Sequence, residues 1–169
     1  DVLTRVPNRR HFHELAARTL AEGVATPCAL MMLDVDDFKR INDEQGHAAG
    51  DAALREVGGC VREALRAPDI AGRLGGDEFA VLLPGTAVDD AIGVAGRIVA
   101  RLGQRHAAQG GPALGLSFGV VQLQADESLD EALRRADQAL YEAKRQGRSR
   151  AVPAFGAEDQ PVFGESRPL

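Results

Sequence analysis

The apolar residues of the first half of the chain form one strand-like run between two helical patterns. Residues 8–23 carry apolar side chains at helical spacing, and the glycine at position 23 predicts the end of that helix. Residues 28–36 form an apolar run that ends in acids, which is typical of a buried central strand. Residues 37–51 are polar and rich in turn-forming residues, so we expect a loop there. From residue 51 to residue 65 the apolar positions follow the 3.6-residue period of an amphipathic helix.

The second half of the chain repeats this alternation. Two short apolar runs, residues 69–74 and 78–84, flank a pair of glycines and predict a β-hairpin. Residues 86–102 show helical spacing behind a threonine that suits a helix N-cap. Residues 105–112 have the composition of a loop, and residues 113–123 predict another strand.

The last predicted helix has a clear start and a clear end. Ser128 and Glu131 form the capping-box pattern, and Gly147 ends the helical spacing. A short strand is expected around residues 149–152. The following residues carry Gly, Pro and acids without a period, so we expect a domain over residues 1–152 and a flexible tail over residues 153–169.

Without its first helix, this order of elements is close to βαββαβ. Such an order predicts an α+β fold with a mostly antiparallel central sheet, and we expect helices to cover one face of that sheet. In the same order, the strand that ends near residue 34 and the strand that begins near residue 78 can be neighbours.

Composition limits the classes of function. A chain of 169 residues, 44% of them hydrophobic, is long enough for one domain with a core. The formal net charge of -5 argues against broad binding to nucleic acids or membrane surfaces, which usually requires a basic excess. It leaves room for a small phosphate ligand, because a metal ion can supply the positive charge.

The cellular setting is also expected from the sequence. Two cysteines without a C-x-x-C pattern indicate buried thiols in a reducing compartment. No apolar run reaches the length that spans a bilayer, and no signal peptide is evident, so we expect a cytoplasmic domain. Because the first residue is Asp1 rather than Met, we expect a longer protein with a sensory or regulatory region before it.

The chemically suggestive acids lie where predicted strands end or begin. Asp34 ends the central strand, and Asp77 follows the hairpin glycines Gly75 and Gly76. Two or three carboxylates and a backbone carbonyl form the hard oxygen site that Mg²⁺ prefers, and phosphate oxygens complete the shell. Acids often simply terminate strands, so the pattern alone is weak evidence. The glycine pair permits close approach of a ligand, but it also suits an ordinary hairpin.

Three cations are candidates for phosphate contacts. Lys39 lies five residues after Asp34, and we expect Lys144 and Arg148 in the last turn of the final helix. Cations at helix C-termini are favoured by the helix dipole alone, so their functional value depends on whether they converge on the acids.

Five motifs occur in the order that characterises one family: DVLTRVPNRR, LDVDDFKRINDEQGHAAGD, RLGGDEFAVLLPG, SFGV and RRADQALYEAKRQGRSR. Together they closely resemble the GGDEF family of diguanylate cyclases, from Asp1 to about Val152. The resemblance implies a core like that of class III nucleotide cyclases and the polymerase palm. The sequence departs from the family pattern at Arg5-Val6, where Gly-Leu is usual, and at Ser149, where Asn is usual.

The resemblance implies condensation of two GTP molecules into cyclic di-GMP with release of two pyrophosphates. Two Mg²⁺ or Mn²⁺ ions per active site would be held by Asp34, the carbonyl of Val35, Asp77 and Glu78. The catalytic residues would be Lys39, Asp77 and Glu78. The further contacts to GTP would come from Asn42, Asp51, Gly75, Gly76, Lys144 and Arg148. Whether Asp77 is a metal ligand, a general base or both stays open in the sequence.

The ligand chemistry fits this assignment. Guanine offers N1–H and N2–H₂ as donors, so a carboxylate such as Asp51 suits it better than adenine. One domain would hold one GTP and the product contains two, which implies a two-fold homodimer with facing sites.

A second site is implied by the motif R-x-x-D at Arg66 to Asp69, five residues before Gly75. In the family this motif, at this distance from the glycines, is the product-inhibition site. Arg66 and Asp69 would bind cyclic di-GMP with help from Arg73, and Arg97 would contribute from a neighbouring molecule.

Two other functions fit parts of the sequence. A catalytically silent module that senses GTP or cyclic di-GMP is disfavoured, because the run from Gly75 to Phe79 is intact. A metal-dependent nucleotidyl transferase with another base preference is disfavoured by Asp51.

Overall fold

The protein is described by a computed structural model over residues 1–23, 25–109 and 114–154. Its helices are α1 (Arg9–Ala21), α2 (Phe38–Gln45), α3 (His47–Ala64), α4 (Val88–Gln109) and α5 (Leu129–Arg145). Its strands are β1 (Cys28–Val35), β2 (Ile70–Arg73), β3 (Glu78–Pro84), β4 (Leu116–Gln122) and β5 (Ala151–Ala154).

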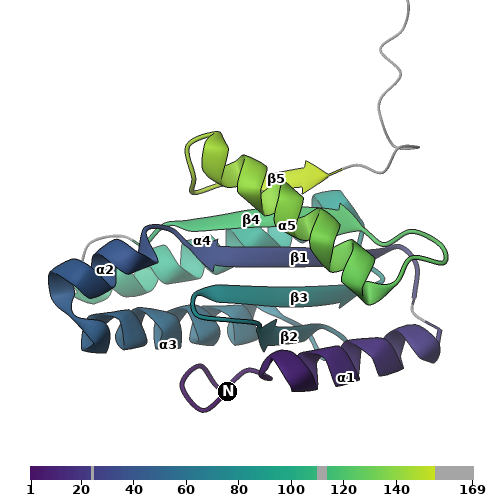
Figure 1. Ribbon diagram of the computed structural model, residues 1–169, viewed down its shortest axis with the longest axis horizontal. Helices are drawn as coiled ribbons and strands as arrows, with labels where there is room; N and C mark the ends of the chain where they lie inside the picture. The colour runs from purple at the N-terminus through teal and green to yellow at the C-terminus, as the bar shows by residue number, and fades with distance from the viewer. Residues whose placement is uncertain (24, 110–113, 155–169) are drawn as a thin grey trace, which may run out of the picture.

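The strands form one sheet in the order β2-β3-β1-β4-β5, and Figure 1 shows β1 at its centre. β1 pairs antiparallel with both β3 and β4, β2 pairs antiparallel with β3, and only β4 and β5 run parallel. The predicted α+β fold with a mostly antiparallel sheet is therefore confirmed.

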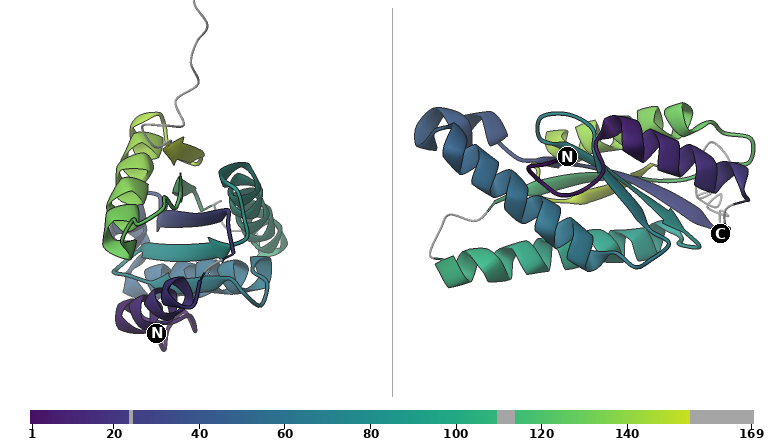
Figure 2. Two further views of the ribbon diagram at one scale, coloured as in Figure 1. Left: turned by 90° about the vertical axis from the view of Figure 1, so that its right-hand side faces the viewer. Right: turned by 90° about the horizontal axis from the view of Figure 1, so that it is seen from below.

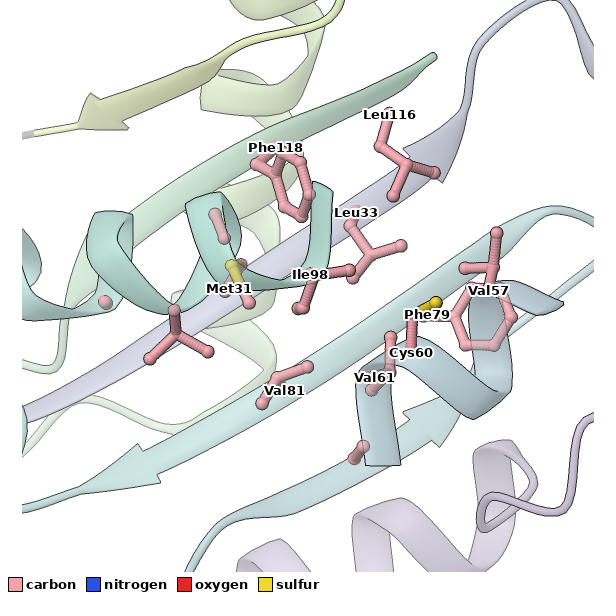
Figure 3. Packing of buried hydrophobic residues seen from close by; sticks show 14 of the residues in the cluster. Met31, Leu33, Val57, Cys60, Val61, Phe79, Val81, Ile98, Leu116 and Phe118 are labelled. Atoms are coloured by element: carbon pink, nitrogen blue, oxygen red, sulfur yellow. The ribbon is translucent and has the colours of Figure 1, made fainter. Parts of the chain in front are cut away.

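Helices cover both faces of the sheet, not the one face that the sequence predicted. α3 and α4 lie on one side, and α1 and α5 lie on the other (Figure 2). Met31 and Leu33 of β1 pack into the first layer, where Figure 3 shows them with Val57 of α3 and Ile98 of α4. The alternate residues of β1 pack into the second layer. All eight residues of β1 are buried, and a strand that is apolar on both faces needs cover on both.

Helical residues occupy parts of both stretches that were predicted as loops. α2 and the first turn of α3 lie within residues 37–51. Gly46 separates them, since it is the C-cap of α2 and the N-cap of α3 and has a non-helical φ of 84°. Phe38 and Ile41 of α2 pack against the core, so tertiary contacts stabilise a helix of polar composition. α4 continues to Gln109 through most of the other predicted loop, whose residues 110–112 lie outside the described part.

The C-terminal elements follow the prediction more closely. The capping box is present, because the amide of Glu131 donates to Ser128 Oγ and the amide of Ser128 donates to the Glu131 carboxylate. β5 continues through Pro153 and Ala154, two residues that the sequence assigned to the tail. Proline fits there because β5 is an edge strand. The rest of the predicted tail, residues 155–169, lies outside the described residues.

None of the helices in the described ranges combines the length and the apolar character that a membrane crossing needs.

Candidate active site

The end of β1 and the start of β3 lie next to each other, with Asp34 paired to Glu78 across the strands. The amide of Val35 donates to the carbonyl of Asp77 at 3.4 Å. The amide of Leu74 donates to the Glu78 carbonyl at 2.8 Å and closes the turn that carries the two glycines. The hairpin predicted from the sequence is present, and its turn brings Asp77 and Glu78 to the end of β1.

Asp34 is the most unusual acid in this group. It is only 4% exposed, and its Oδ1 lies 2.9 Å from Nζ of Lys144, which reaches over from the last turn of α5. The pKa of Asp34 is raised to about 6, chiefly by burial; Lys144 opposes the rise, and the charges of Asp77 and Glu78 add to it. One lysine therefore leaves three carboxylates short of positive charge, and a divalent cation would supply it.

The residues fit a divalent metal in chemistry rather than in their present arrangement. Carboxylate oxygens are the ligands that Mg²⁺ and Mn²⁺ prefer. Among the residues described, no three His, Cys, Asp or Glu side chains are gathered closely enough to hold an ion. Lys144 contacts Asp34, while Asp77 and Glu78 are partly exposed, so in this arrangement the three carboxylates do not form a metal site.

The predicted guanine contacts lie on two facing helices. Asn42 is on α2, and its side chain lies against Gly50 of α3, where an added Cβ would clash with it. Asp51 is the next residue of α3 and is exposed, 3.9 Å from Arg55 one helical turn away. The close approach of α2 and α3 at Gly50 thus places an amide and a carboxylate on neighbouring helices.

Two of the three predicted phosphate cations, Lys144 and Arg148, contact acids at this end of the sheet. Lys39 is exposed in the first turn of α2, and Lys144 contacts Asp34. Arg148 does not lie in the last turn of α5, as the sequence predicted, but in the turn beyond it, with a φ of 61°. Its Nε lies 3.7 Å from Oδ1 of Asp37, the residue just before α2. Lys144 and Arg148 are far from Asp34 and Asp37 in the sequence. They meet because α5 packs against β1 and the turn after α5 lies beside the start of α2.

Sequence reasoning missed one buried acid. Asp36 is 8% exposed and accepts hydrogen bonds from the Ser117 hydroxyl at 2.6 Å and from the amide and hydroxyl of Ser149 at 3.0 and 3.1 Å. The available signal was its place two residues after Asp34, at the end of the same strand.

A second pocket of about 310 Å³ lies at the other end of β3 and is lined by Arg66, Asp69, Thr86 and Arg97 among others. Arg66 is fixed there, because its Nε lies 3.3 Å from Asp69 Oδ1 and its Nη2 donates to the Pro84 carbonyl and the Thr86 hydroxyl at 2.8 and 2.9 Å. Arg66 and Asp69 thus line one cavity, and so does Arg97 of the same chain, which the sequence prediction took from a neighbouring molecule.

Arg73, the fourth residue, lies elsewhere. Its guanidinium donates to the Gly76 carbonyl at 2.7 Å and to the Asp1 carboxylate at 3.1 Å. It supports the glycine turn, and it does not line the pocket around Arg66. The prediction erred because Arg73 closely follows the R-x-x-D motif in sequence, while the strand β2 carries it to the opposite end.

A larger cleft of about 680 Å³ opens beside the end of β1, where Asp36 and Asp37 line it. Its walls come from α2, α3, the end of α4, Gly115 and the turn formed by Gly147, Arg148 and Ser149. Asn42 and Asp51 are not among its lining residues, so it is distinct from the predicted guanine contacts.

Comparisons with known proteins agree with this arrangement. A family described as "Diguanylate cyclase, GGDEF domain" matches residues 1–150. Diguanylate cyclase DgcM of Escherichia coli is 35% identical over 91% of this chain and 38% of its own length. Diguanylate cyclase DgcP of Pseudomonas aeruginosa is 40% identical over 89% of this chain and 23% of its own length. The chain therefore spans well under half the length of these curated relatives.

A solved structure shows the same fold. The crystal structure of the GGDEF domain of DgcB from Caulobacter crescentus, in complex with c-di-GMP, superposes with a TM-score of 0.79 at 30% identity. The match covers 90% of this chain and 91% of that one. The family match covers nearly all described residues, and the fold is shared with a GGDEF domain of known structure. In this chain, acids on a Gly-Gly turn lie beside the central strand. The chain therefore belongs to the GGDEF domain family of diguanylate cyclases.

Proposed function

We propose that this domain condenses two GTP molecules into cyclic di-GMP and releases two pyrophosphates. One observation carries the proposal: Asp34, Glu78 and Lys144 meet at the end of β1, beside a turn of two glycines that leaves open space at Gly76. One buried and two partly exposed carboxylates, with more negative charge than Lys144 balances and with small residues beside them, suit a nucleoside triphosphate bound with a divalent metal.

Each side chain has a role in this proposal. Asp51 accepts hydrogen bonds from N1–H and N2–H₂ of guanine, Asn42 contacts the same base edge, and the Gly75-Gly76 turn lies along the nucleotide. Three cations, Lys39, Lys144 and Arg148, hold the phosphates and stabilise the negative charge that develops on the leaving pyrophosphate.

Metal ions fit the carboxylates of Asp34, Asp77 and Glu78 with the Val35 carbonyl, and two Mg²⁺ or Mn²⁺ ions would supply Lewis-acid chemistry and neutralise phosphate charge. A ribose 3′-hydroxyl attacks an α-phosphorus, and Asp77 or Glu78 accepts the hydroxyl proton. Both carboxylates are partly exposed, so either can turn toward the nucleotide.

The product contains two guanylyl units, so the active species in this proposal is a two-fold homodimer with facing sites. The domain acts as the catalytic part of a longer protein, in line with relatives in which the matching region is 38% and 23% of the length. A sensory or regulatory region would control the pairing.

We propose that the pocket around Arg66 and Asp69 binds cyclic di-GMP and that this binding inhibits the cyclase reaction. Its support is geometric, because Asp69 orients Arg66 and Arg97 lines the same cavity. A guanidinium held in this way can bind phosphate or a guanine edge.

Catalysis is tested by incubating the protein with GTP and Mg²⁺ over a range of protein concentrations and measuring cyclic di-GMP. We expect the rate per monomer to rise with concentration, and Asp77→Asn to abolish turnover. The matched control Asp137→Asn changes an exposed acid on α5 and should keep wild-type turnover. Product formation that survives Asp77→Asn would contradict the assignment of the site.

Product inhibition is tested separately by measuring initial rates with added cyclic di-GMP. Arg66→Ala should raise the inhibition constant by about tenfold or more while keeping the initial rate without product. Arg10→Ala, on the exposed face of α1, is the control. An unchanged inhibition constant would show that the pocket is not the inhibitory site.

A further inference from the structure

The turn that carries Arg148 has an unusual backbone. Between α5 and β5, three successive residues have positive φ: Gly147 at 109°, Arg148 at 61° and Ser149 at 50°. Glycine adopts this region readily, but arginine and serine do so rarely, so contacts with the rest of the protein must hold the turn.

Those contacts come mainly from one buried acid. The carboxylate of Asp36 accepts two hydrogen bonds from Ser149, through its amide at 3.0 Å and its hydroxyl at 3.1 Å. It accepts a third from the Ser117 hydroxyl at 2.6 Å, and the Asp36 amide donates to the Gly115 carbonyl at 2.9 Å. Asp36 therefore ties the end of β1 to both β4 and the Arg148 turn.

The spacing around this carboxylate is tight. A Cβ added at Gly115 would lie 2.6 Å from Asp36 Oδ2 and 2.7 Å from Ser149 Oγ. Gly147, Arg148 and Ser149 also line the cleft of about 680 Å³, together with Asp36 and Gly115. The hydrogen bonds to Asp36 are thus the attachment of the turn to β1.

The side chain of Arg148 is held much more weakly than its backbone. Its Nε lies 3.7 Å from Oδ1 of Asp37, and the two side chains are 51% and 46% exposed. Exposed ion pairs of this kind are weak, so the guanidinium can leave Asp37 for a ligand while the backbone stays in place.

We propose that Asp36 is a positioning residue that fixes the Arg148 turn, so that the guanidinium starts from a set place and exchanges Asp37 for the terminal phosphates of GTP. The inference rests on the proposed function, because it takes Arg148 as a phosphate contact. In these terms the two adjacent acids act in opposite directions. Asp36 prepares Arg148 for the nucleotide, and Asp37 competes with the nucleotide for it.

The test compares two ligands, guanosine 5′-monophosphate and a GTP analogue with a methylene group between the α- and β-phosphorus, by calorimetry with Mg²⁺. The ratio of their dissociation constants reports the contacts to the outer phosphates. Asp36→Asn keeps the shape of the side chain but cannot accept all three hydrogen bonds. It should weaken analogue binding by about tenfold and leave monophosphate binding within about twofold.

Asp37→Asn is the matched control, since asparagine tolerates the φ of 54° at this position. It removes the competing carboxylate, and we expect it to bind the analogue about twofold more tightly. Weaker analogue binding by Asp37→Asn would overturn the opposed roles of the two acids.

A double-mutant cycle separates positioning from general destabilisation. If Asp36 acts through Arg148, then Asp36→Asn/Arg148→Ala binds the analogue no more weakly than Arg148→Ala alone. Additive losses in the cycle would overturn the inference. If Asp36→Asn does not fold, Ser149→Ala replaces it in the cycle, with an expected loss of about threefold.

Failure of the proposed function has a different signature. If the wild-type protein binds the analogue no more tightly than the monophosphate, or Arg148→Ala binds it as well as wild type, the phosphate site itself is wrong. If Arg148→Ala weakens analogue binding and Asp36→Asn does not, only the positioning role of Asp36 is wrong.

Discussion

The buried carboxylate of Asp34 predicts that this domain gives up stability at its active site. Replacing Asp34 with Asn keeps the size of the side chain and removes its charge, and the amide oxygen can still accept a hydrogen bond from Lys144. We expect Asp34→Asn to make the metal-free protein more stable at neutral pH, although it removes a residue assigned to catalysis.

The magnitude follows from the pKa of Asp34. Burial raises that pKa from 3.8 to about 6, so the folded state binds the proton more tightly than the unfolded state. The free energy of unfolding therefore falls as pH rises through the window between 3.8 and about 6, and the whole penalty is present above it. That difference corresponds to about 3 kcal/mol, with the opposing effect of Lys144 already included, so we expect Asp34→Asn to recover about 2–3 kcal/mol.

Urea unfolding in the presence of a chelator tests this at pH 8 and at pH 4.5. Asp34→Asn should have the higher midpoint at pH 8 with an unchanged m-value, and its advantage should shrink to less than about 1 kcal/mol at pH 4.5. Asp137→Asn, an exposed acid on α5, should show no such pH dependence. A less stable Asp34→Asn at pH 8, or an advantage that does not vary with pH, would refute the reasoning.

Three further predictions concern packing and the metal site. Gly119→Ala should lower the free energy of unfolding by about 3 kcal/mol or more in a urea titration, because the added Cβ would overlap the backbone of α5. The control Gly93→Ala, at an exposed helical position with open space, should raise the free energy of unfolding by up to about 1 kcal/mol, and equal effects of the two changes would contradict the packing argument. Lys144→Gln should raise the affinity for Mn²⁺ without nucleotide about fivefold, measured by electron paramagnetic resonance, because the ammonium competes for Asp34; a weaker affinity would mean that Lys144 helps the ion to bind. Cys28 is buried and its pKa is raised to about 11, so iodoacetamide at pH 8 should modify it only in unfolded protein, and rapid labelling of the native protein would refute this.

The strands were predictable because their signals are local. β1 is apolar at every position except Asp34, and the Gly-Gly pair marks the hairpin between β2 and β3. α2 was not predictable in the same way, because its eight residues are mostly polar. Contacts of Phe38 and Ile41 with the core, made only in the folded chain, decide its structure.

The site shows the same division. The acids and cations stand out by residue type and by the order of the motifs around them. The role of Asp36 could not be found in this way, because its partners Ser117 and Ser149 lie 81 and 113 positions away in the sequence. The error on Arg73 has the same cause, since proximity in sequence to Asp69 does not show which end of a strand a side chain occupies.

The central place of β1 also has a consequence for synthesis of the protein. Its neighbours are the later strands β3 and β4, so Met31 meets Val81 first and Val120 only after most of the domain has left the ribosome. Until then a strand with no solvent-facing residue has at most one of its two edges paired. At about 5–20 residues per second this interval lasts several seconds, and it makes the nascent domain a natural client for chaperones that shield apolar segments.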